Sequence, residues 1–347
     1  MKNCKKQEGM IGMRIAVDIF GGDNAPLEPL KACIRATKEG IAGIIAVGDE
    51  GRIRSAAEKE GLDLTGIEIL HAPSVIPVEA NPTDITKKYG DSSMAVTLRA
   101  VAEGKADAAI SAGSTGAFVV GATLIVKRIK GVRRAAFAPV IPSGKGAFMM
   151  LDVGANVDCR PEMLVQFALL GSIYMEKVMG VRSPTVGLVN IGTEETKGQE
   201  LQIEAHRLLK DAPVNFIGNV EPRYLPGGAC DVAVADGFTG NIVLKTMEGT
   251  IGALFGEIKK VLYSSAMTKL AALMLKKGLV GLKRKMDYAE YGGTALLGIS
   301  KPIVKVHGDS RAKTYVSAMR QAVRMYELNV VGLMSEAVSA QRMKEEE

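Results

Sequence analysis

The stretch Arg14-Ile-Ala-Val-Asp-Ile-Phe-Gly-Gly-Asp-Asn24 joins an apolar, β-branched run to a polar turn, and an amphipathic run over 27–39 follows it. This succession predicts a strand, a tight turn and a helix. The same pattern recurs along the chain. It predicts strands at 14–19, 44–47, 67–70, 107–111, 135–140, 147–151, 185–190, 214–217 and 231–235, and helices at 27–39, 92–103, 162–179 and 195–209. Repeated strand–helix units indicate an α/β fold with a mostly parallel sheet and helices on both faces.

Many of the predicted strands end in polar turns that contain glycine or aspartate, at 18–23, 111–116, 152–156, 190–193 and 235–241. In an open α/β sheet the ligand lies beyond the carboxyl ends of the strands. We therefore expect these turns to converge on one crevice.

Composition is that of a globular protein, with 347 residues of which 47% are hydrophobic and 24% charged. We expect a leader at 1–12 that is disordered, a single α/β catalytic domain at 13–338 and a charged tail at 339–347. The leader has no apolar run typical of a signal peptide. The longest apolar stretch, 117–126, is shorter than the roughly 20 residues that span a bilayer. These features predict a cytoplasmic protein.

The net charge and the cysteine residues indicate which classes of partner, metal site and disulfide to expect. The net charge of +6 suits an acidic protein, anionic lipid or phosphate-bearing substrates, although a basic surface without a specific partner has the same charge. No interleaved basic and aromatic motif indicates nucleic acid. The four cysteines form no C-x-x-C pair and the three histidines are scattered, so we expect neither a metal site nor a disulfide framework.

The segment 251–286 differs in texture, since apolar residues at helical spacing alternate with lysine and arginine. Its basic residues are Lys259, Lys260, Lys269, Lys276, Lys277, Lys283, Arg284 and Lys285. Such a helical segment can lie on a membrane surface or pack on a partner helix. A dimer-forming hairpin is an equally good interpretation, and the two are compatible.

The run Ser111-Ala-Gly-Ser-Thr-Gly116 follows a predicted strand and opens a predicted helix. Free amides of the first turn and the hydroxyl groups form an anion site there, although such a run is often only a helix cap with a tight bend. It is neither a Walker A loop nor G-x-G-x-x-G, so no nucleotide is required and no cofactor is expected.

Other polar residues can reach the same crevice. Asp23, Asn24, Asp236 and Asn241 follow strands, while Thr239 can instead cap a helix that begins near Asn241. Lysines can neutralise phosphate charge, and a histidine at an expected strand end is either structural or catalytic. G-x-S-x-G is absent, and no other covalent-catalysis signature is visible, which fits direct attack by an external nucleophile. Phosphate is such a nucleophile, and a thioester is a reactive acyl donor.

Eight short motifs are each weak evidence alone, but together they are specific enough to indicate a protein family. In chain order they are Val17-Asp-Ile-Phe-Gly-Gly-Asp-Asn-Ala-Pro26, Lys87-Lys-Tyr-Gly-Asp-Ser-Ser-Met94, Ala106-Asp-Ala-Ala-Ile-Ser-Ala-Gly-Ser-Thr-Gly-Ala117, Leu151-Asp-Val-Gly-Ala-Asn-Val-Asp158, Val189-Asn-Ile-Gly-Thr-Glu-Glu-Thr-Lys-Gly198, Asp236-Gly-Phe-Thr-Gly-Asn241, Tyr291-Gly-Gly293 and His307-Gly308. The series resembles the bacterial phosphate acyltransferases of the PlsX family from about residue 13 to about residue 338. Two positions depart from the family's usual pattern, Asn24 in place of histidine and Ser114 in place of asparagine. Both keep hydrogen-bonding ability.

The resemblance implies acyl transfer from acyl carrier protein to inorganic phosphate, which gives acyl-phosphate for a membrane glycerol-3-phosphate acyltransferase at the start of phospholipid synthesis. It also implies a homodimer that contacts the membrane peripherally, with a Rossmann-like αβα fold of the isopropylmalate dehydrogenase and phosphotransacetylase type and a protruding helical segment. From motif position, we expect Lys197, His307 and Asp236 to be catalytic. The expected substrate- or phosphate-binding residues are Gly22, Asp23, Asn24, Lys87, Lys88, Ser111, Gly113, Ser114, Thr115, Gly116, Asp152, Asn156, Thr239 and Asn241.

Three other functions remain open at this point. A short-chain phosphotransacetylase acting on acyl-coenzyme A needs a similar fold and chemistry. An NAD-dependent decarboxylating dehydrogenase is disfavoured, because neither a nucleotide fingerprint nor a metal-binding carboxylate set is visible. A carrier-protein-binding scaffold without turnover is the non-enzymatic alternative.

Overall fold

The computed structural model describes residues 12–285 and 291–346. Its contacts divide the chain into two compact units. Unit 1 comprises residues 1–128 and 299–331, and unit 2 comprises 129–298 and 332–347. The single catalytic domain expected at 13–338 stays a prediction, and the leader lies outside the described residues except for Gly12.

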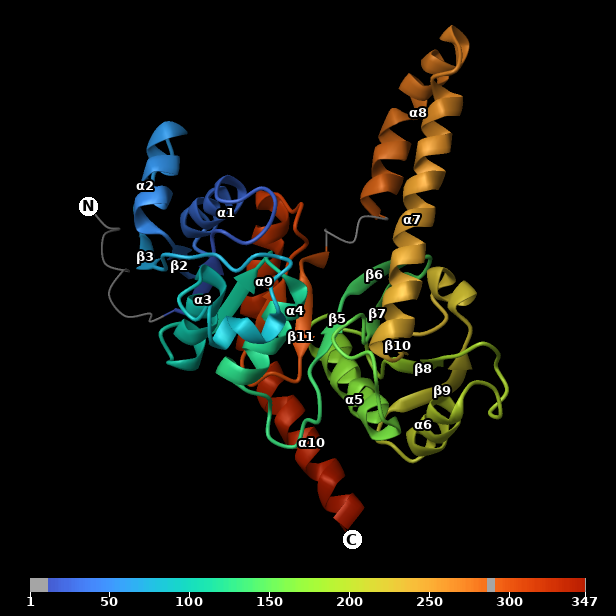
Figure 1. The fold of residues 1–347 in the computed structure, drawn as a ribbon. Coiled ribbons are helices and arrows are strands. Elements are labelled where there is room, and N and C mark those ends of the chain that lie inside the picture. The colour runs from blue at the N-terminus through green and yellow to red at the C-terminus, as the bar shows by residue number, and fades with distance from the viewer. Residues whose placement is uncertain (1–11, 286–290, 347) are drawn as a thin grey trace, which may run out of the picture. The chain divides into compact units, whose positions relative to one another are not determined.

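Unit 1 is built on five parallel strands (Figure 1). In sheet order they are β3 (Ile67–His71), β2 (Gly43–Gly48), β1 (Arg14–Asp18), β4 (Ala108–Ser111) and β12 (Ile303–Lys305). The inner strands β1 and β4 are almost wholly buried, as the continuous apolar runs of their sequences require. The predicted strands over 14–19, 44–47, 67–70 and 107–111 are confirmed within one residue.

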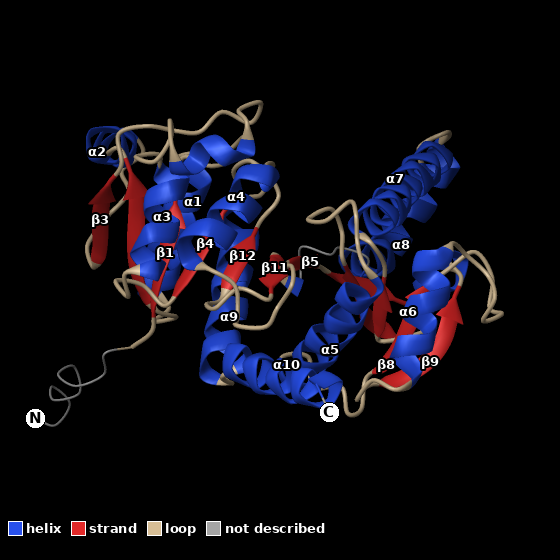
Figure 2. Ribbon diagram, turned by 60° about the horizontal axis from the view of Figure 1, so that its bottom comes forward, coloured by secondary structure: helices blue, strands red, loops and turns tan. Residues whose placement is uncertain are grey.

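Helices cover both faces of this sheet (Figure 2). The right-handed crossover from β1 through α1 to β2 runs in one direction, and the crossover from β3 through α3 to β4 runs in the other, so α1 and α3 lie on opposite faces. The helical elements are α1 (Leu27–Lys38), α2 (Glu50–Lys59), η1 (Pro82–Thr86), α3 (Ser93–Ala102), α4 (Thr115–Gly121), the π-helical η2 (Ala122–Val126) and α9 (Ala312–Glu327).

Unit 2 contains a second sheet, in which β7, β10, β8 and β9 are parallel and β6 is antiparallel at one edge. In sheet order the strands are β6 (Val140–Ser143), β7 (Gly146–Leu151), β10 (Val232–Val234), β8 (Thr185–Val189) and β9 (Asn215–Val220). A further antiparallel pair joins β5 (Ala136–Ala138) to β11 (Thr294–Leu297). The helical elements here are α5 (Pro161–Lys177), α6 (Glu200–Lys210), η3 (Pro222–Gly227), α7 (Gly237–Leu262) and α8 (Ala266–Lys285).

One expectation about unit 2 is corrected. The single strand expected over 135–140 is two strands, because Pro139 between them has no N–H to continue a ladder. The chain ends in α10 (Val330–Glu346), which includes most of the charged tail predicted at 339–347.

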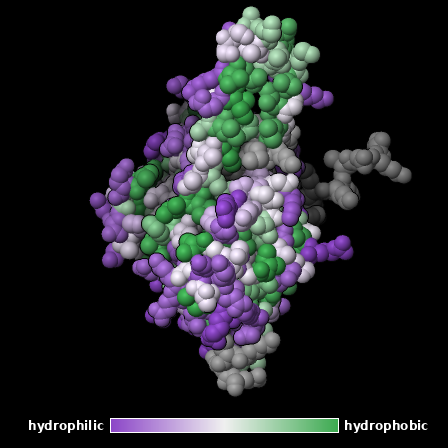
Figure 3. Space-filling model, turned by 90° about the vertical axis from the view of Figure 1, so that its right-hand side faces the viewer, coloured by the Kyte–Doolittle hydropathy of each residue, from purple (hydrophilic) through white to green (hydrophobic). Residues whose placement is uncertain are grey.

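Over its described residues, 251–285, the basic amphipathic segment expected at 251–286 is a helical hairpin, formed by the second half of α7 and by α8 (Figure 1). At its tip, the Thr268 amide donates to Ser265 Oγ at 3.1 Å and the Ser265 amide donates to Thr268 Oγ1 at 3.0 Å, a reciprocal cap that starts α8. Apolar side chains are exposed along the hairpin (Figure 3). They include Leu254, Val261, Met267, Leu270, Leu273, Met274, Leu275 and Val280. Within the described ranges, no helix is long and apolar enough to cross a membrane.

Candidate functional site

The carboxyl ends of β1, β4 and β12 lie side by side in unit 1, and they bring three polar side chains into one row. Lys305 is paired in register with Ser111 on the neighbouring strand. On its other side Ser111 donates from Oγ to Asp18 Oδ2 at 2.6 Å. All three side chains are buried. These three residues, Asp18, Ser111 and Lys305, form a polar row across the carboxyl ends of three adjacent buried strands.

Asp18 is the centre of a dense set of hydrogen bonds. Its Oδ1 accepts the amides of Phe20 at 3.2 Å and Gly21 at 3.1 Å, and Ser93 is a further side-chain donor. Burial raises the pKa of the Asp18 carboxyl, while these donors act in the opposite direction. The carboxylate thereby fixes the turn that leaves β1.

Glycine is required at positions 21 and 22, because the backbone of this turn lies very close to the neighbouring turns. A Cβ at Gly21 would lie 2.5 Å from Asp18 Oδ2 and 2.7 Å from the Gly113 nitrogen. Gly22 adopts a φ of +93°, and a Cβ there would lie 2.9 Å from the Gly308 carbonyl oxygen. The turns after β1, β4 and β12 are thus packed directly on one another, as the motif positions predict.

Asn24 and His307 belong to the same set of turns. Asn24 Nδ2 donates to the Asp309 carbonyl oxygen at 2.8 Å, and the Asp23 amide donates to the Gly308 carbonyl oxygen at 2.8 Å. His307 is exposed, with its Nδ1 2.6 Å from Asp309 Oδ1. It lies just after β12, as its expected position at a strand end requires.

The remaining predicted residues of unit 1 lie around α4. Ser114 is the buried residue that precedes α4, and its side chain makes no capping hydrogen bond. Thr115 and Gly116 form the first turn, where a Cβ on Gly116 would lie 2.9 Å from Pro82 Cγ of η1. Lys87 and Lys88 follow η1 and are exposed.

Unit 2 also brings turns together at adjacent carboxyl ends, those of β7, β10 and β8. Asp152 follows β7 and is completely buried. Its Oδ1 accepts the Phe137 amide at 2.9 Å, and its Oδ2 accepts the backbone amide of Asn156 at 2.6 Å and Asn156 Nδ2 at 2.9 Å. Burial raises the pKa of Asp152 to about 6 despite these donors.

Asp236 follows β10 and caps α7, which corrects the expectation that Thr239 caps a helix near Asn241. Asp236 Oδ1 accepts the Thr239 amide at 2.8 Å, and the Thr239 hydroxyl donates to Asp236 Oδ2 at 2.7 Å. The helix consequently begins at Gly237, four residues earlier than expected. Asn241 is exposed, and its amide carbon is 3.6 Å from the position of a Cβ on Gly154.

The loop after β8 carries Lys197, whose side chain is exposed. A buried side chain holds its backbone in place, because Asn190 donates from Nδ2 to the Lys197 carbonyl oxygen at 3.0 Å. Asn219 similarly donates to the Glu194 carbonyl oxygen at 2.8 Å. The loop therefore presents Lys197 from a fixed backbone.

The structure thus gathers the predicted residues within each unit, and their convergence on one crevice stays a prediction. Asp18 and Lys305 of the polar row, and Ser93, which donates to Asp18, are missing from the site residues predicted from sequence. A lysine inside the apolar run over 303–306 is a signal that could have pointed to Lys305. Over the ranges that the structure describes, no cluster of His, Cys, Asp and Glu is suited to a metal ion.

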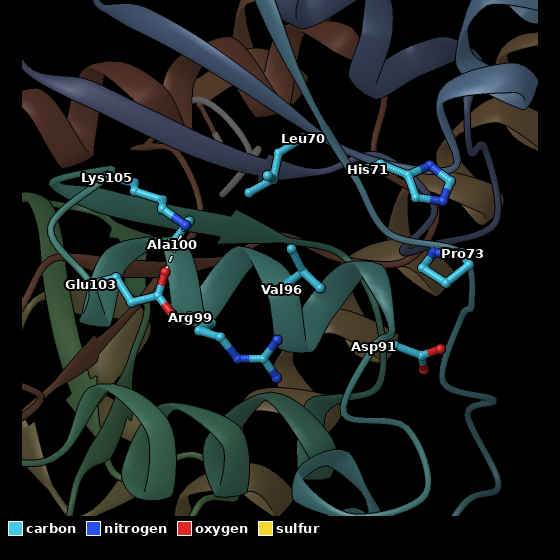
Figure 4. A pocket seen from close by; sticks show the side chains of 9 residues that line it. All are labelled: Leu70, His71, Pro73, Asp91, Val96, Arg99, Ala100, Glu103 and Lys105. Atoms are coloured by element: carbon cyan, nitrogen blue, oxygen red, sulfur yellow. Dashed lines mark ion pairs between the residues drawn. The ribbon is translucent and has the colours of Figure 1, made fainter.

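A surface cavity of about 390 Å³ in unit 1 contains none of the predicted residues (Figure 4). Its walls come from the end of β3, with Leu70 and His71, and from one side of α3, with Val96 and Arg99. At its rim Lys105 and Glu103 form an ion pair of 2.8 Å. Since its charged groups are of both signs and partly paired, it is not an obvious anion site.

Two α/β units with polar turns at adjacent strand ends place the chain among the Rossmann-like α/β folds. Solved structures agree on the fold. A phosphotransacetylase from Streptococcus pyogenes has a TM-score of 0.63 at 18% identity, covering 91% of this chain and 94% of that one. A 4-hydroxythreonine-4-phosphate dehydrogenase from Klebsiella pneumoniae has a TM-score of 0.54 at 12% identity, covering 92% and 99%.

Sequence comparison gives the family. The family model described as "fatty acid synthesis protein" matches residues 13–333. A phosphate acyltransferase of Clostridium botulinum (strain ATCC 19397 / Type A) is 48% identical over 321 residues, which are 92% of this chain and 96% of that protein. A phosphate acyltransferase of Clostridium acetobutylicum is 46% identical over 324 residues, covering 93% and 98%. The chain belongs to this family of phosphate acyltransferases, the family that its motifs resemble.

Proposed function

We propose that this acyltransferase takes a fatty acyl group from the thioester of acyl carrier protein and transfers it to inorganic phosphate. The product is an acyl-phosphate that supplies phosphatidic acid and phospholipid synthesis. The observation that carries the proposal is the match of residues 13–333 to the fatty acid synthesis family, together with relatives named phosphate acyltransferase at 48% identity.

The chemistry needs little covalent help from the protein. A phosphate oxygen attacks the thioester carbonyl, a tetrahedral oxyanion forms, and the thiolate leaves as the acyl–oxygen bond is retained. The enzyme must position two reactants and stabilise the oxyanion, which hydrogen-bond donors in a water-poor site do well. Buried Ser111 and the packed turns over 21–24 and 111–116 suit the positioning of phosphate.

Within this proposal the residues have distinct roles. Lys197 and His307 are the exposed groups that can stabilise the oxyanion or protonate the leaving thiolate. Asp236 is held by Thr239, and Asp152 by Asn156, so these four residues shape the turns of unit 2. The other predicted residues contribute backbone and side-chain donors around the substrates.

The hairpin and the charge favour a lipid-linked donor. Exposed apolar side chains on α7 and α8 alternate with exposed lysines such as Lys259, Lys269 and Lys276, which is the pattern of a surface that contacts anionic lipid. The net charge of +6 suits an acidic carrier protein. We propose that the enzyme is a cytoplasmic homodimer, bound peripherally to the membrane, where its product reaches the membrane glycerol-3-phosphate acyltransferase.

A second donor is supported by a specific observation. The folds of two phosphotransacetylases, from Streptococcus pyogenes and Staphylococcus aureus, match this chain with TM-scores of 0.63 and 0.60. Acyl-coenzyme A is therefore the alternative donor for the same transfer to phosphate.

The test is release of free carrier protein from palmitoyl-acyl carrier protein, with and without inorganic phosphate. We expect phosphate-dependent release and an acyl product that hydroxylamine traps. Release from palmitoyl-coenzyme A but not from palmitoyl-acyl carrier protein would show that acyl-coenzyme A is the acyl donor. No release from either thioester, with carrier protein still bound, would indicate a scaffold instead of an enzyme.

A further inference from the structure

Lys305 is the only lysine or arginine among the buried residues in the part of the chain that the structure describes, with 9% of its surface exposed. Burying an ammonium group costs several kcal/mol unless other groups compensate for the lost water. It lies at the end of β12, where the turns after β1, β4 and β12 meet. A buried cation at this place requires an explanation.

We propose that Lys305 binds the inorganic phosphate substrate at the polar row of unit 1. This inference rests on the transfer to phosphate proposed above, but not on the identity of the acyl donor. Lys305 lies outside the eight sequence motifs described above.

The register of the sheet places Lys305 beside hydrogen-bonding groups that suit an anion. It is paired with Ser111, and side chains paired in register on neighbouring strands point to the same face. The Val306 amide donates to the Ser111 carbonyl oxygen at 3.0 Å, which fixes the two strand ends together. The ammonium group is therefore held beside the turn over 111–116, the predicted anion site.

The ammonium group also has donors to spare. An ammonium group carries three N–H donors. In the described structure Lys305 uses one of them, from Nζ to the Val306 carbonyl oxygen at 2.6 Å. The other donors are available to a ligand, and a phosphate oxygen accepts such charge-assisted hydrogen bonds strongly.

The alternative is that Lys305 only neutralises Asp18. Asp18 and Asp23 are the carboxylates that interact electrostatically with it, and they favour its charged form. Asp18, however, already accepts hydrogen bonds from Ser111, Ser93 and two backbone amides. A counter-ion and a substrate-binding group are distinguishable, because only the first becomes dispensable when Asp18 loses its charge.

Titration supplies a second way to distinguish them. Burial lowers the pKa of Lys305 to about 8, although Asp18 and Asp23 oppose this shift. The other ionisable groups near these turns are His307 and Asp309 after β12, Glu28 on α1, Arg311 before α9 and Tyr315 on α9. Phosphate affinity should fall as pH rises through 8, since the neutral amine cannot attract the anion.

The experiment compares Lys305→Met, Lys305→Arg and the double variant Asp18→Asn/Lys305→Met, with Lys301→Met as the matched control at the other end of β12. Inorganic phosphate binding is measured by isothermal titration calorimetry, which needs no acyl donor. The KM values for phosphate and for the thioester that the wild type turns over are measured separately. Thermal unfolding of each variant reports stability.

We expect Lys305→Met to weaken phosphate binding about tenfold or more, the effect of losing one charge-assisted hydrogen bond, and to change the thioester KM little. Lys305→Arg should keep phosphate binding at pH 7 and remove its weakening above pH 8. The double variant should recover thermal stability but not phosphate affinity.

Recovery of phosphate affinity in the double variant would show that Lys305 is only a counter-ion. Unchanged phosphate binding in Lys305→Met would also overturn the proposal. If Lys305→Met does not fold, the arginine and double variants decide. If palmitoyl-acyl carrier protein is not turned over while phosphate binding still depends on Lys305, only the proposed donor is wrong.

Discussion

In unit 1 the carboxyl ends of β1, β4 and β12 lie side by side, and in unit 2 those of β7, β10 and β8 do the same. In each unit an aspartate at the end of the first of these strands fixes the turn: Asp18 is the last residue of β1, and Asp152 directly follows β7. The neighbours differ. Asp18 shares its row with a hydroxyl group and a buried cation, whereas Asp152 is held by amide groups from the backbone and from Asn156.

The difference indicates separate tasks for the two edges. In unit 1 a buried cation with spare donors offsets the neighbouring carboxylates and can attract phosphate, whereas the buried carboxylate of unit 2 has only neutral donors. The edge of unit 1 is thus suited to bind the anion. The edge of unit 2 is suited to shape turns and to present Lys197, and its predicted phosphate-binding residues, such as Asp152, stay predictions.

The largest effect is expected where unit 2 is packed most closely. A Cβ on Gly240 would collide with the Asp152 carbonyl oxygen, so Gly240→Ala should destabilise the protein by about 3 kcal/mol or more. Gly252→Ala is the matched control in the same helix, because nothing lies within 4 Å of its Cβ. That control should stabilise by about 1 kcal/mol. Urea unfolding measures both, and equal effects would contradict the close packing of this edge.

The contributions of Asp152 and Lys305 to stability should change with pH in opposite directions. Burial raises the pKa of Asp152 from 3.8 to about 6, so the folded protein binds this proton more tightly than the unfolded chain does. Its contribution to stability is present below pH 4 and is lost as pH rises through 6, a change of about 3 kcal/mol. Asp152→Asn should remove this loss in unfolding measured from pH 4 to 7.

For Lys305 the expected change of stability with pH has the opposite sign. Its pKa is lowered from 10.5 to about 8, so the unfolded chain binds more protons between these values and stability should rise with pH there. Lys305→Met should remove that rise. The same sign of pH dependence at both residues would break the comparison.

In the part of the chain that the structure describes, the exposed basic hairpin lies in unit 2, so the proposed lipid contact is expected there. Lys276→Glu/Lys277→Glu should weaken binding to anionic vesicles by about 2 kcal/mol or more, because each lysine near such a surface contributes about 1 kcal/mol and each glutamate adds repulsion. Lys38→Glu/Lys59→Glu in unit 1 changes the net charge equally and should have little effect. Soluble turnover should be retained in both. Vesicle flotation with equal loss in the two variants would indicate a general charge effect.

The smallest difference is expected between two asparagines that play similar parts in the two units. Asn156 donates to the buried carboxylate of Asp152 and to the Ala135 carbonyl oxygen, whereas Asn24 donates only to carbonyl oxygens. Asn156→Ala should therefore cost about 2 kcal/mol and Asn24→Ala about 1 kcal/mol. The reverse order in urea unfolding would show that Asp152 does not depend on its amide donors.

Local patterns in the sequence predict much of this fold. The apolar runs locate β1, β2, β3, β4, β7 and β8 within about one residue, because buried parallel strands have continuous apolar sequences. They give no strand for β11, which has four residues and pairs with β5. For β12 they indicate only that a strand ends near His307.

The candidate site is predictable to a similar extent. The polar turns are visible as motifs, and the structure packs them together within each unit. The pairing of Lys305 with Ser111 is invisible, since these residues lie far apart in the chain and meet only through the sheet register. The cap of α7 shows the same limit, because composition alone does not decide between Asp236 and Thr239.

The most direct test of the division between the two edges is a crystal structure of the protein with arsenate, an analogue of phosphate whose anomalous scattering locates it. We predict arsenate within hydrogen-bonding distance of Lys305 Nζ, at the polar row of unit 1. Arsenate bound to the turns of unit 2, with Lys305 making no contact to it, would contradict the account.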